Sequence, residues 1–209
     1  MKKWILGIGI IILLCFLWSF GVINGAFKVW DNQILEFITS FLRKDLLIAC
    51  FKGMTFLGSA IWFLCFTIIT FLFFKNKWIG IMMGINTLLI AGFNLILKDI
   101  FAISRPVYAL IEEIGYSYPS GHAMASLAFY GFLIYLIYKL MRKGFKRSFL
   151  IIFLLFLILA IGFSRIYLGV HYPSDIIGGY LFSFGYLLVF ILGLKKLGLE
   201  KLLCGIKKK

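Results

Sequence analysis

Apolar residues occur along this 209-residue chain in long uninterrupted runs rather than in an alternating pattern. Six stretches contain no Asp, Glu, Lys or Arg and are long enough, or nearly so, to cross a bilayer, which takes roughly 17–25 apolar residues as a helix. They cover approximately residues 4–25, 53–74, 78–97, 118–138, 148–164 and 176–194. We therefore predict an all-α, polytopic membrane protein with six transmembrane helices, in which residues 1–209 form a single domain.

The segment between the first two runs has a different pattern. Its apolar positions recur at the i, i+3, i+4, i+7 spacing of one helical face, and polar residues flank them. These positions are Ile34, Phe37, Ile38, Phe41 and Leu42. We expect a short interfacial helix on the outer side of the membrane, which either packs against the bundle or forms a lid or lipid-facing gate.

The net charge of +14 adds an orientation to this picture. Of the 22 Lys and Arg, 15 cluster at alternate ends of the predicted spans, and Glu200 is the one acid among them. Because basic residues are enriched in cytoplasmic loops, we expect both termini to be cytoplasmic. These dispersed basic loops and tails suit anionic membrane lipids, so we expect no nucleic-acid partner.

The chain is 63% hydrophobic and 14% charged, yet its scarce reactive residues concentrate in two segments that this topology places outside. A charged side chain at mid-bilayer costs about 2.5–3.5 kcal/mol on insertion scales, and the cost falls at the outer ends of spans. There the low dielectric still strengthens the attraction to an anion. The placement favours a site that meets a charged headgroup from the outer leaflet. Its members are Lys98, Arg105, Pro106, Pro119, His122, Arg165, His171, Pro173 and Asp175.

The first cluster lies in KDIFAISRP. Lys98 and Arg105 are seven residues apart, so both face one way if the third span continues outward as a helix. Pro106 would then end or bend that helix. Two cations on one face suit a phosphate, and Arg can bind it through two parallel hydrogen bonds. Taken alone, the pair fits equally well as two cations that reach lipid headgroups.

The second cluster is YPSGH, at the start of the fourth run. Pro119 suits the first turn of a helix, Ser120 offers a hydroxyl, and Gly121 allows close backbone approach. The free N–H groups of a helix N-terminus form a ready anion site, which would place His122 beside the bound anion. An ordinary N-capped span with an interfacial His is the alternative.

The third cluster is SRIYLGVHYPSD, between the last two runs. His171 and Asp175 are four residues apart, so a helical turn brings the carboxylate to the imidazole. A carboxylate on Nδ1–H leaves Nε2 with a free lone pair, as a nucleophilic or basic His needs. Arg165 ends the preceding span. A capped helix start with an incidental His–Asp pair is the alternative.

Together the clusters describe a phosphate site, because one topology sends all three to the same membrane face. Three cations, a helix N-terminus, two His and one Asp supply anion binding, a nucleophile and an acid. The carboxylates are too few for a magnesium cage, and two His without Cys make a poor zinc site. We therefore expect no metal and no other cofactor.

At these residues the sequence resembles the type 2 phosphatidic acid phosphatases, whose signature also occurs in vanadium haloperoxidases and glucose-6-phosphatase. The matching motifs are Lys98-x6-Arg105-Pro106, then Pro119-Ser120-Gly121-His122, then Ser164-Arg165-x5-His171-x3-Asp175. All signature positions are filled, in the expected order and spacing. The chain length and basic ends are most similar to bacterial members of the family.

The resemblance implies a role for each residue. His171 would attack phosphorus to form a phosphohistidine, Asp175 would orient His171, and His122 would protonate the leaving group. The phosphoryl oxygens would be held by Lys98, Arg105, Ser120, Gly121 and Arg165.

The implied activity is metal-independent hydrolysis of a membrane lipid phosphate at the outer face of a bacterial cell membrane. Phosphatidylglycerophosphate is the first candidate substrate, and undecaprenyl pyrophosphate and phosphatidic acid are alternatives that no residue separates. A transporter is a distant alternative, since its ionisable groups would lie near mid-span. A haloperoxidase is disfavoured because six spans leave no soluble body. The sequence leaves the oligomeric state open.

Overall fold

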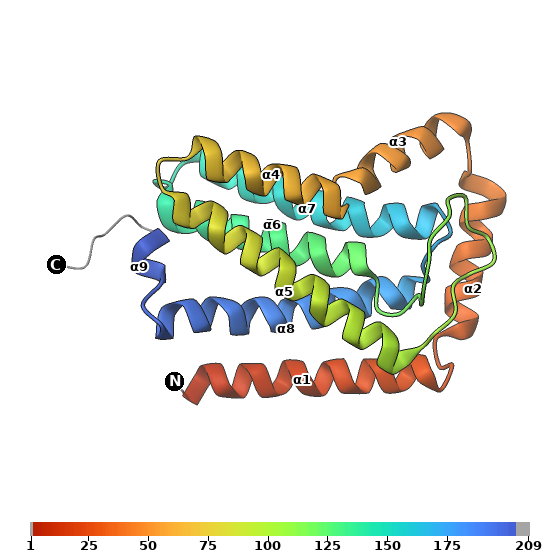
Figure 1. The fold of residues 1–209 in the computed structure, drawn as a ribbon. Coiled ribbons are helices and arrows are strands. Elements are labelled where there is room, and N and C mark those ends of the chain that lie inside the picture. Colours follow the sequence, from red (N-terminus) through yellow and green to blue (C-terminus); the bar gives the residue numbers. More distant parts are fainter. Residues whose placement is uncertain (1, 204–209) are drawn as a thin grey trace.

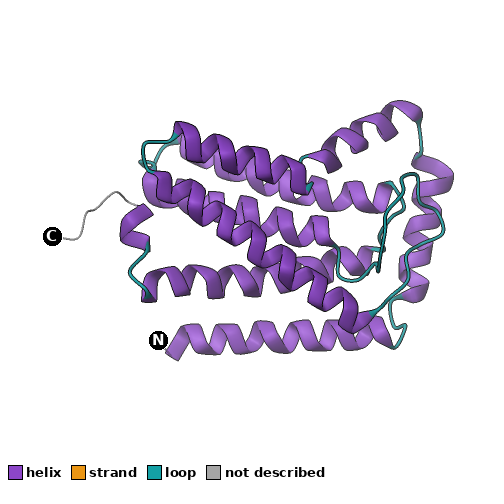
Figure 2. Ribbon diagram, viewed as in Figure 1, coloured by secondary structure: helices purple, strands orange, loops and turns teal. Residues whose placement is uncertain are grey.

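The computed structural model describes residues 2–203, and side chains from residue 6 onward. Residue 1 and residues 204–209, which include the basic tail Lys207 to Lys209 and the end of the predicted domain, lie outside this part. Every regular element among the described residues is a helix (Figure 2). The helices are α1 (Lys2–Ile23), α2 (Lys28–Phe37), η1 (Ile38–Leu42), α3 (Asp45–Phe56), α4 (Ala60–Phe73), α5 (Lys77–Phe101), α6 (Gly121–Leu140), α7 (Phe145–Tyr167), α8 (Pro173–Lys196) and α9 (Glu200–Leu203).

Five helices are long and apolar enough to cross a membrane: α1, α5, α6, α7 and α8. The predicted all-α membrane fold is therefore confirmed at this level. The predicted second span, residues 53–74, is not one continuous helix. It belongs to α3 and α4, which are bent by 49° relative to each other and form a sixth span only as a pair.

The break between α3 and α4 has a local cause. Ser59 leaves the helical conformation and its hydroxyl accepts a hydrogen bond from the Trp62 backbone N–H at 3.2 Å, which caps α4. A serine that binds the backbone in this way favours a helix start over a helix interior. A run without charged residues thus contains a helix boundary that its hydropathy did not indicate.

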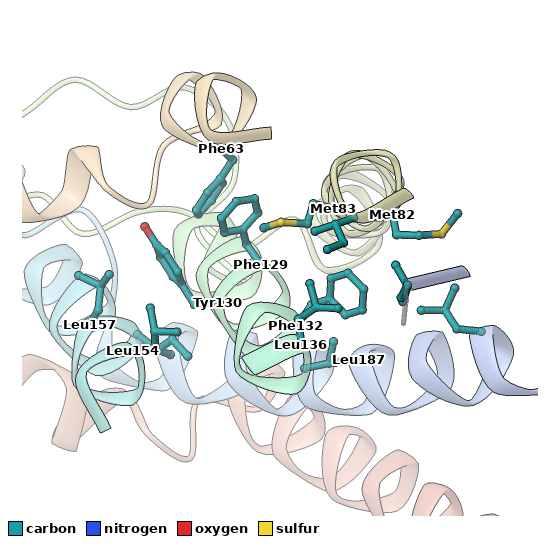
Figure 3. Close-up of a cluster of buried hydrophobic side chains, with 14 of the residues drawn as sticks. Phe63, Met82, Met83, Phe129, Tyr130, Phe132, Leu136, Leu154, Leu157 and Leu187 are labelled. Carbon is teal, nitrogen blue, oxygen red and sulfur yellow. The ribbon is translucent and has the colours of Figure 1, made fainter. Parts of the chain in front are cut away.

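Helix α6 occupies the centre of the bundle (Figure 1). It packs against α5, α7 and α8, whereas α4 packs on α5, α3 on α7 and α1 on α8. A cluster of buried side chains fills the middle of this arrangement (Figure 3). Within it the rings of Phe63 and Phe129 stack with their centroids 4.5 Å apart. The central helix is thereby fixed against its neighbours, and both of the motif-bearing helix starts, those of α6 and α8, are anchored to one core.

The interfacial segment differs from the prediction in its packing. Helix α2 starts earlier than expected and passes into a single π-helical turn, η1. Its buried positions are Asp31, Leu35 and Ile38, while Phe37 and Phe41 of the predicted apolar face are exposed. The buried face is shifted because Asp31 bonds to the start of α8. The segment therefore packs against the bundle through a face that shares Ile38 with the predicted one but otherwise consists of Asp31 and Leu35.

The two ends of the bundle differ in composition. The start of α1, the α4–α5 and α6–α7 connections and α9 lie at one end of Figure 1, where the clustered basic residues are found. Helix α2 and the loops 102–120 and 168–172 lie at the opposite end. All three predicted clusters therefore meet at the end away from the basic loops.

Candidate active site

The site is built on the tight connection between α7 and α8. Gly169 has φ +71, and a Cβ atom there would lie 2.3 Å from the Tyr108 carbonyl oxygen, so this turn requires glycine. His171 and Asp175 are four positions apart in the sequence, and α8 starts between them. Their side chains meet as predicted, with 3.3 Å between Nδ1 and Oδ2. Both are almost fully buried.

The Asp175 carboxylate accepts two hydrogen bonds at this helix start. Its Oδ2 accepts a hydrogen bond from the Tyr172 backbone N–H at 2.8 Å, which caps α8, and a second one from the Ser117 hydroxyl at 2.5 Å. The Ser117 oxygen also lies 3.2 Å from Nδ1 of His171. Because Ser117 donates to the carboxylate, its oxygen can accept from the imidazole. The network thus assigns the imidazole proton to Nδ1.

Arg105 faces the other imidazole nitrogen. Its Nη1 lies 3.2 Å from Nε2 of His171 and donates to the Val170 carbonyl at 3.0 Å. Arginine has only donors, so Nε2 presents its lone pair. Burial, together with Arg165, Arg105 and Lys98, holds the pKa of His171 well below its ordinary value. The imidazole is therefore neutral near pH 7, as a nucleophile must be.

Arg105 does not reach this position on a helix, so the condition under which Lys98 and Arg105 would share one helical face is not met. Helix α5 ends at Phe101, and the next residue, Ala102, adopts a left-handed conformation that stops it. Arg105 instead lies in the loop 102–120, where it donates to the carbonyls of Ile114 and Gly115. Lys98, in the last turn of α5, donates to the Tyr116 carbonyl. Loop contacts, not helical periodicity, bring the two cations together.

The start of α6 supplies the second motif. Ser120 is the N-cap, and its oxygen lies 3.5 Å from the Ala123 backbone N–H. Asn94 donates to the Pro119 carbonyl at 3.0 Å, and a Cβ on Gly121 would lie 2.9 Å from its amide oxygen. Gly121 is therefore required by this close approach. His122 follows in the first turn of the helix.

Arg165 is fully buried at the end of α7. Its guanidinium donates to the Thr55 hydroxyl of α3 at 2.6 Å and pairs with the Glu113 carboxylate. Glu113 also lies 3.8 Å from Nη2 of Arg105, so it joins two of the predicted phosphate-binding residues. Burial opposes ionisation of Glu113, but Arg165 outweighs it and keeps the pKa of the carboxyl below its usual range.

One cavity of about 410 Å³ connects the clusters. Five of the predicted residues line it, and Arg165, Asp175 and Ser120 lie buried beside it, where they hold neighbouring groups. The described residues contain no cluster of three His, Cys, Asp or Glu side chains that could hold a metal ion. Cations and a helix N-terminus surrounding an open volume suit an anion. The lining predicted residues are Lys98, Arg105, Gly121, His122 and His171.

Comparison with known proteins identifies the family to which this chain belongs. Residues 77–198, more than half of the chain, match the PAP2 superfamily. The chain belongs to this superfamily. The matched region contains every residue of the three predicted clusters. As a PAP2 protein the chain is a membrane lipid phosphatase, a hydrolase that acts on phosphate esters.

Individual relatives agree with this assignment. Phosphatidylglycerophosphatase B of Bacillus subtilis (strain 168) is 32% identical over 161 residues, which cover 72% of this chain and 75% of that protein. The bacitracin transport permease protein BcrC of Bacillus licheniformis is 43% identical over 82 residues, 39% of this chain and 36% of that protein. The predicted similarity to bacterial phosphatidylglycerophosphate phosphatase B is thus confirmed.

Solved structures share the fold. The crystal structure of a transmembrane PAP2-type phosphatidylglycerolphosphate phosphatase from Bacillus subtilis superposes with a TM-score of 0.78 at 27% identity, covering 90% of this chain and 96% of that one. LpxE of Aquifex aeolicus superposes with a TM-score of 0.60 at 23% identity, covering 79% and 95%. The second match supports the fold alone.

Three residues that contribute to the site were not identified from the sequence. Ser117 bridges Asp175 and His171, Glu113 pairs with two arginines, and Asp31 accepts hydrogen bonds from the backbone and hydroxyl of Ser174 at 2.9 and 2.6 Å. The acidic pair at 112–113 in an otherwise apolar chain was an available signal for Glu113. Neither Ser117 nor Asp31 stands at a distinctive spacing, so long-range packing alone places them.

Proposed function

We propose that this PAP2 phosphatase hydrolyses phosphatidylglycerophosphate to phosphatidylglycerol and phosphate through a phosphohistidine on His171. In this proposal residues 1–209 act as a single integral-membrane phosphatase domain. The observation that carries it is the orientation of the imidazole, whose Nδ1 faces Asp175 and whose Nε2 faces Arg105 in the cavity. The nucleophilic lone pair is directed at the place where cations would hold a phosphoryl group.

The first half-reaction would form a phosphorus–nitrogen bond at Nε2 of His171 as the phosphate ester bond breaks. Lys98, Arg105, Arg165, the Ser120 hydroxyl and the Gly121 N–H would bind the phosphoryl oxygens. Phosphoryl transfer depends mainly on positioning and charge stabilisation, which these groups would supply. Asp175 would stabilise the positive charge on the imidazole as it forms. No metal ion takes part in this scheme.

His122 would act as general acid in this step and as general base in the next. It lines the same cavity as His171, so its proton could pass to the leaving alkoxide of the lipid. Neutral His122 would then take a proton from water, which attacks the phosphohistidine and breaks the phosphorus–nitrogen bond. Inorganic phosphate leaves, and both histidines return to their starting states.

The proposed orientation places this reaction outside the cytoplasm. The basic connections at the far end of the bundle favour a cytoplasmic location for that end and for both termini. The protein would then cross the cell membrane several times, with the site facing outward. Helix α2 would then lie on the outer side. A lipid phosphate in the outer leaflet would reach the cavity without crossing the membrane.

Undecaprenyl pyrophosphate and phosphatidic acid are the alternative substrates, since the same chemistry serves any phosphate anhydride or monoester. The transport named for the Bacillus licheniformis relative is a distant alternative for this chain. Polar groups of the spans argue against it because they serve packing: Asn86 donates to the Ala128 carbonyl at 2.9 Å and Thr87 to that of Met83 at 2.9 Å.

A phosphate-release panel tests the proposal. The detergent-purified protein would be supplied with phosphatidylglycerophosphate, phosphatidic acid and undecaprenyl pyrophosphate, with and without excess EDTA, beside the His171→Ala variant. We expect fastest release from phosphatidylglycerophosphate, unaffected by EDTA. Faster turnover of undecaprenyl pyrophosphate would transfer the assignment to that lipid, and strict dependence on a divalent cation would contradict the metal-free scheme.

A further inference from the structure

Glu113 places a negative charge where a phosphate site needs only positive ones. One of its carboxylate oxygens pairs with Nη2 of Arg165, and the other lies 3.8 Å from Nη2 of Arg105. Its side chain lines the cavity together with Lys98 and His122. A carboxylate that bridges two guanidinium groups in this way has the charge and the oxygen geometry of one edge of a phosphoryl group.

The two arginines differ in the hydrogen-bond partners of their guanidinium groups. Arg105 makes four hydrogen bonds, to the carbonyls of Ile114 and Gly115 in its own loop and to Val170 and His171 in the α7–α8 connection. None of these bonds involves the Glu113 side chain. Arg165 is fully buried, and its Nε–H has no partner. The Glu113 carboxylate is therefore the anion that balances a buried cation, and the cation keeps a donor unused. A buried unpaired guanidinium would be costly, so some anion must occupy this position.

The loop that carries Glu113 is held by other bonds. The Ser117 backbone N–H donates to the Ile103 carbonyl at 2.7 Å, and the Leu110 N–H donates to the Leu168 carbonyl at 2.9 Å. These two bonds lie on either side of Glu113 in the sequence. The carboxylate can therefore leave the arginines by rotation of its side chain, without unfolding of the loop.

We propose that Glu113 is an internal competing anion, which neutralises Arg165 and Arg105 in the empty site and is displaced by the phosphoryl group of the substrate. This inference rests on the proposed function, because it takes the cavity to be the phosphate site. A site with three cations and no internal anion would retain inorganic phosphate after hydrolysis. Glu113 returns to the arginines as phosphate leaves, so it lowers the affinity for the product and determines how selectively the site holds a lipid over free phosphate.

Glu113→Gln tests the inference, because the amide keeps the shape and one acceptor oxygen but lacks the charge. Glu112→Gln is the matched control, since it removes the same charge from the adjacent, exposed residue. Two quantities would be measured: the inhibition constant of inorganic phosphate in the lipid phosphatase assay, and the rise in thermal unfolding temperature that inorganic phosphate produces.

We expect inhibition by phosphate to become about tenfold tighter or more in Glu113→Gln, because charge pairs at close range commonly couple by at least that factor. Phosphate should also raise the unfolding temperature of this variant more than that of the wild type, since a ligand stabilises the state it binds. Glu112→Gln should behave like the wild type in both measurements. Slower product release should lower kcat in Glu113→Gln.

The outcomes separate this inference from the proposed function. Unchanged or weaker phosphate inhibition in Glu113→Gln, in a wild-type protein that hydrolyses lipid phosphates, would overturn the inference alone. Absence of lipid phosphatase activity in the wild type would overturn the proposed function. If Glu113→Gln does not fold in the absence of phosphate, we expect added phosphate to restore folding. Failure to restore it would also contradict the inference, because a displaceable anion must be replaceable by phosphate.

Discussion

The middle of the bundle and the end that holds the proposed active site (the catalytic end) are held together by different kinds of contact. In the middle, rings and aliphatic side chains such as Phe63, Phe129 and Leu187 pack without direction (Figure 3). At the catalytic end, single hydrogen bonds of fixed direction join Ser117, Asp175 and His171. Apolar packing distributes its energy over many weak contacts, whereas each polar bond sets one angle or one proton position. Substitutions in the two regions should therefore fail in different ways.

The largest effect should come from His171, the proposed nucleophile at the catalytic end. His171→Ala should lower phosphate release from lipid substrates by about 10⁴-fold or more, because loss of a nucleophile removes the covalent route. The thermal unfolding temperature should fall only modestly by comparison, since the buried imidazole makes polar contacts and is not a member of the apolar clusters. Phosphate release and unfolding would be measured on the same detergent-purified sample. Retention of full activity would exclude His171 as the nucleophile.

Two aspartates bond to the start of α8, Asp175 from within its first turn and Asp31 from α2, and they provide the next largest contrast. Asp175→Asn should lower kcat by about 10²–10⁴-fold, because an amide no longer holds the proton on Nδ1 of His171. Asp31→Asn alters another buried carboxylate, which lies on α2 and bonds Ser174 at the start of α8 but not the imidazole. We expect its kcat to fall less than tenfold. Equal losses in the two variants would show that capping of α8, and not the tautomer, limits catalysis.

Truncation of a side chain in the apolar middle should instead lower the stability of the fold far more than kcat. Phe129→Ala removes a ring that is almost fully buried and stacked on Phe63, so it should destabilise the fold by about 3–5 kcal/mol. The kcat of the protein that remains folded should stay within about twofold of the wild type. Thermal unfolding and activity per folded molecule would be compared. A large loss of kcat without loss of stability would remove the distinction between the two regions.

The smallest effect concerns the pH dependence at the catalytic end. Burial and three cations hold the pKa of His171 low, so its neutral form persists to acidic pH. Lys98→Met removes one cation, which favours the imidazolium and raises that pKa. The acid limb of kcat/KM should therefore move toward higher pH, while Lys52→Met, a change at an exposed position of α3, should leave the limb in place. A limb that moves toward lower pH in Lys98→Met would contradict the electrostatic account.

The same contrast explains what the sequence could predict. Long apolar runs require helices in a membrane, so five spans and the placement of the three clusters followed from hydropathy. The His171–Asp175 pair followed from spacing because both residues lie at one helix start. The break at Ser59 did not, since a single hydroxyl inside an apolar run leaves hydropathy unchanged.

Residues of the loop 102–120 were the least predictable part of the site. An irregular segment has no period, so the side chain of Arg105 could be placed only by assuming that the third span continues outward as a helix. Helix α5 instead ends at Phe101, and loop contacts bring Arg105 to Nε2 of His171. Ser117 and Glu113 take their positions from contacts with α7 and α8, more than 50 residues later in the chain. Such contacts depend on the packed bundle and carry no local signature.

Direct observation of the covalent intermediate tests the central claim most closely. The wild-type protein would be mixed with phosphatidylglycerophosphate, stopped within a turnover under alkaline denaturing conditions that preserve phosphohistidine, and digested for mass spectrometry. The account predicts a phosphoryl group on His171 that is absent from His171→Ala and accumulates without any added metal ion. A phosphoryl group on another residue, or turnover with no phosphorylated protein at any time, would contradict it.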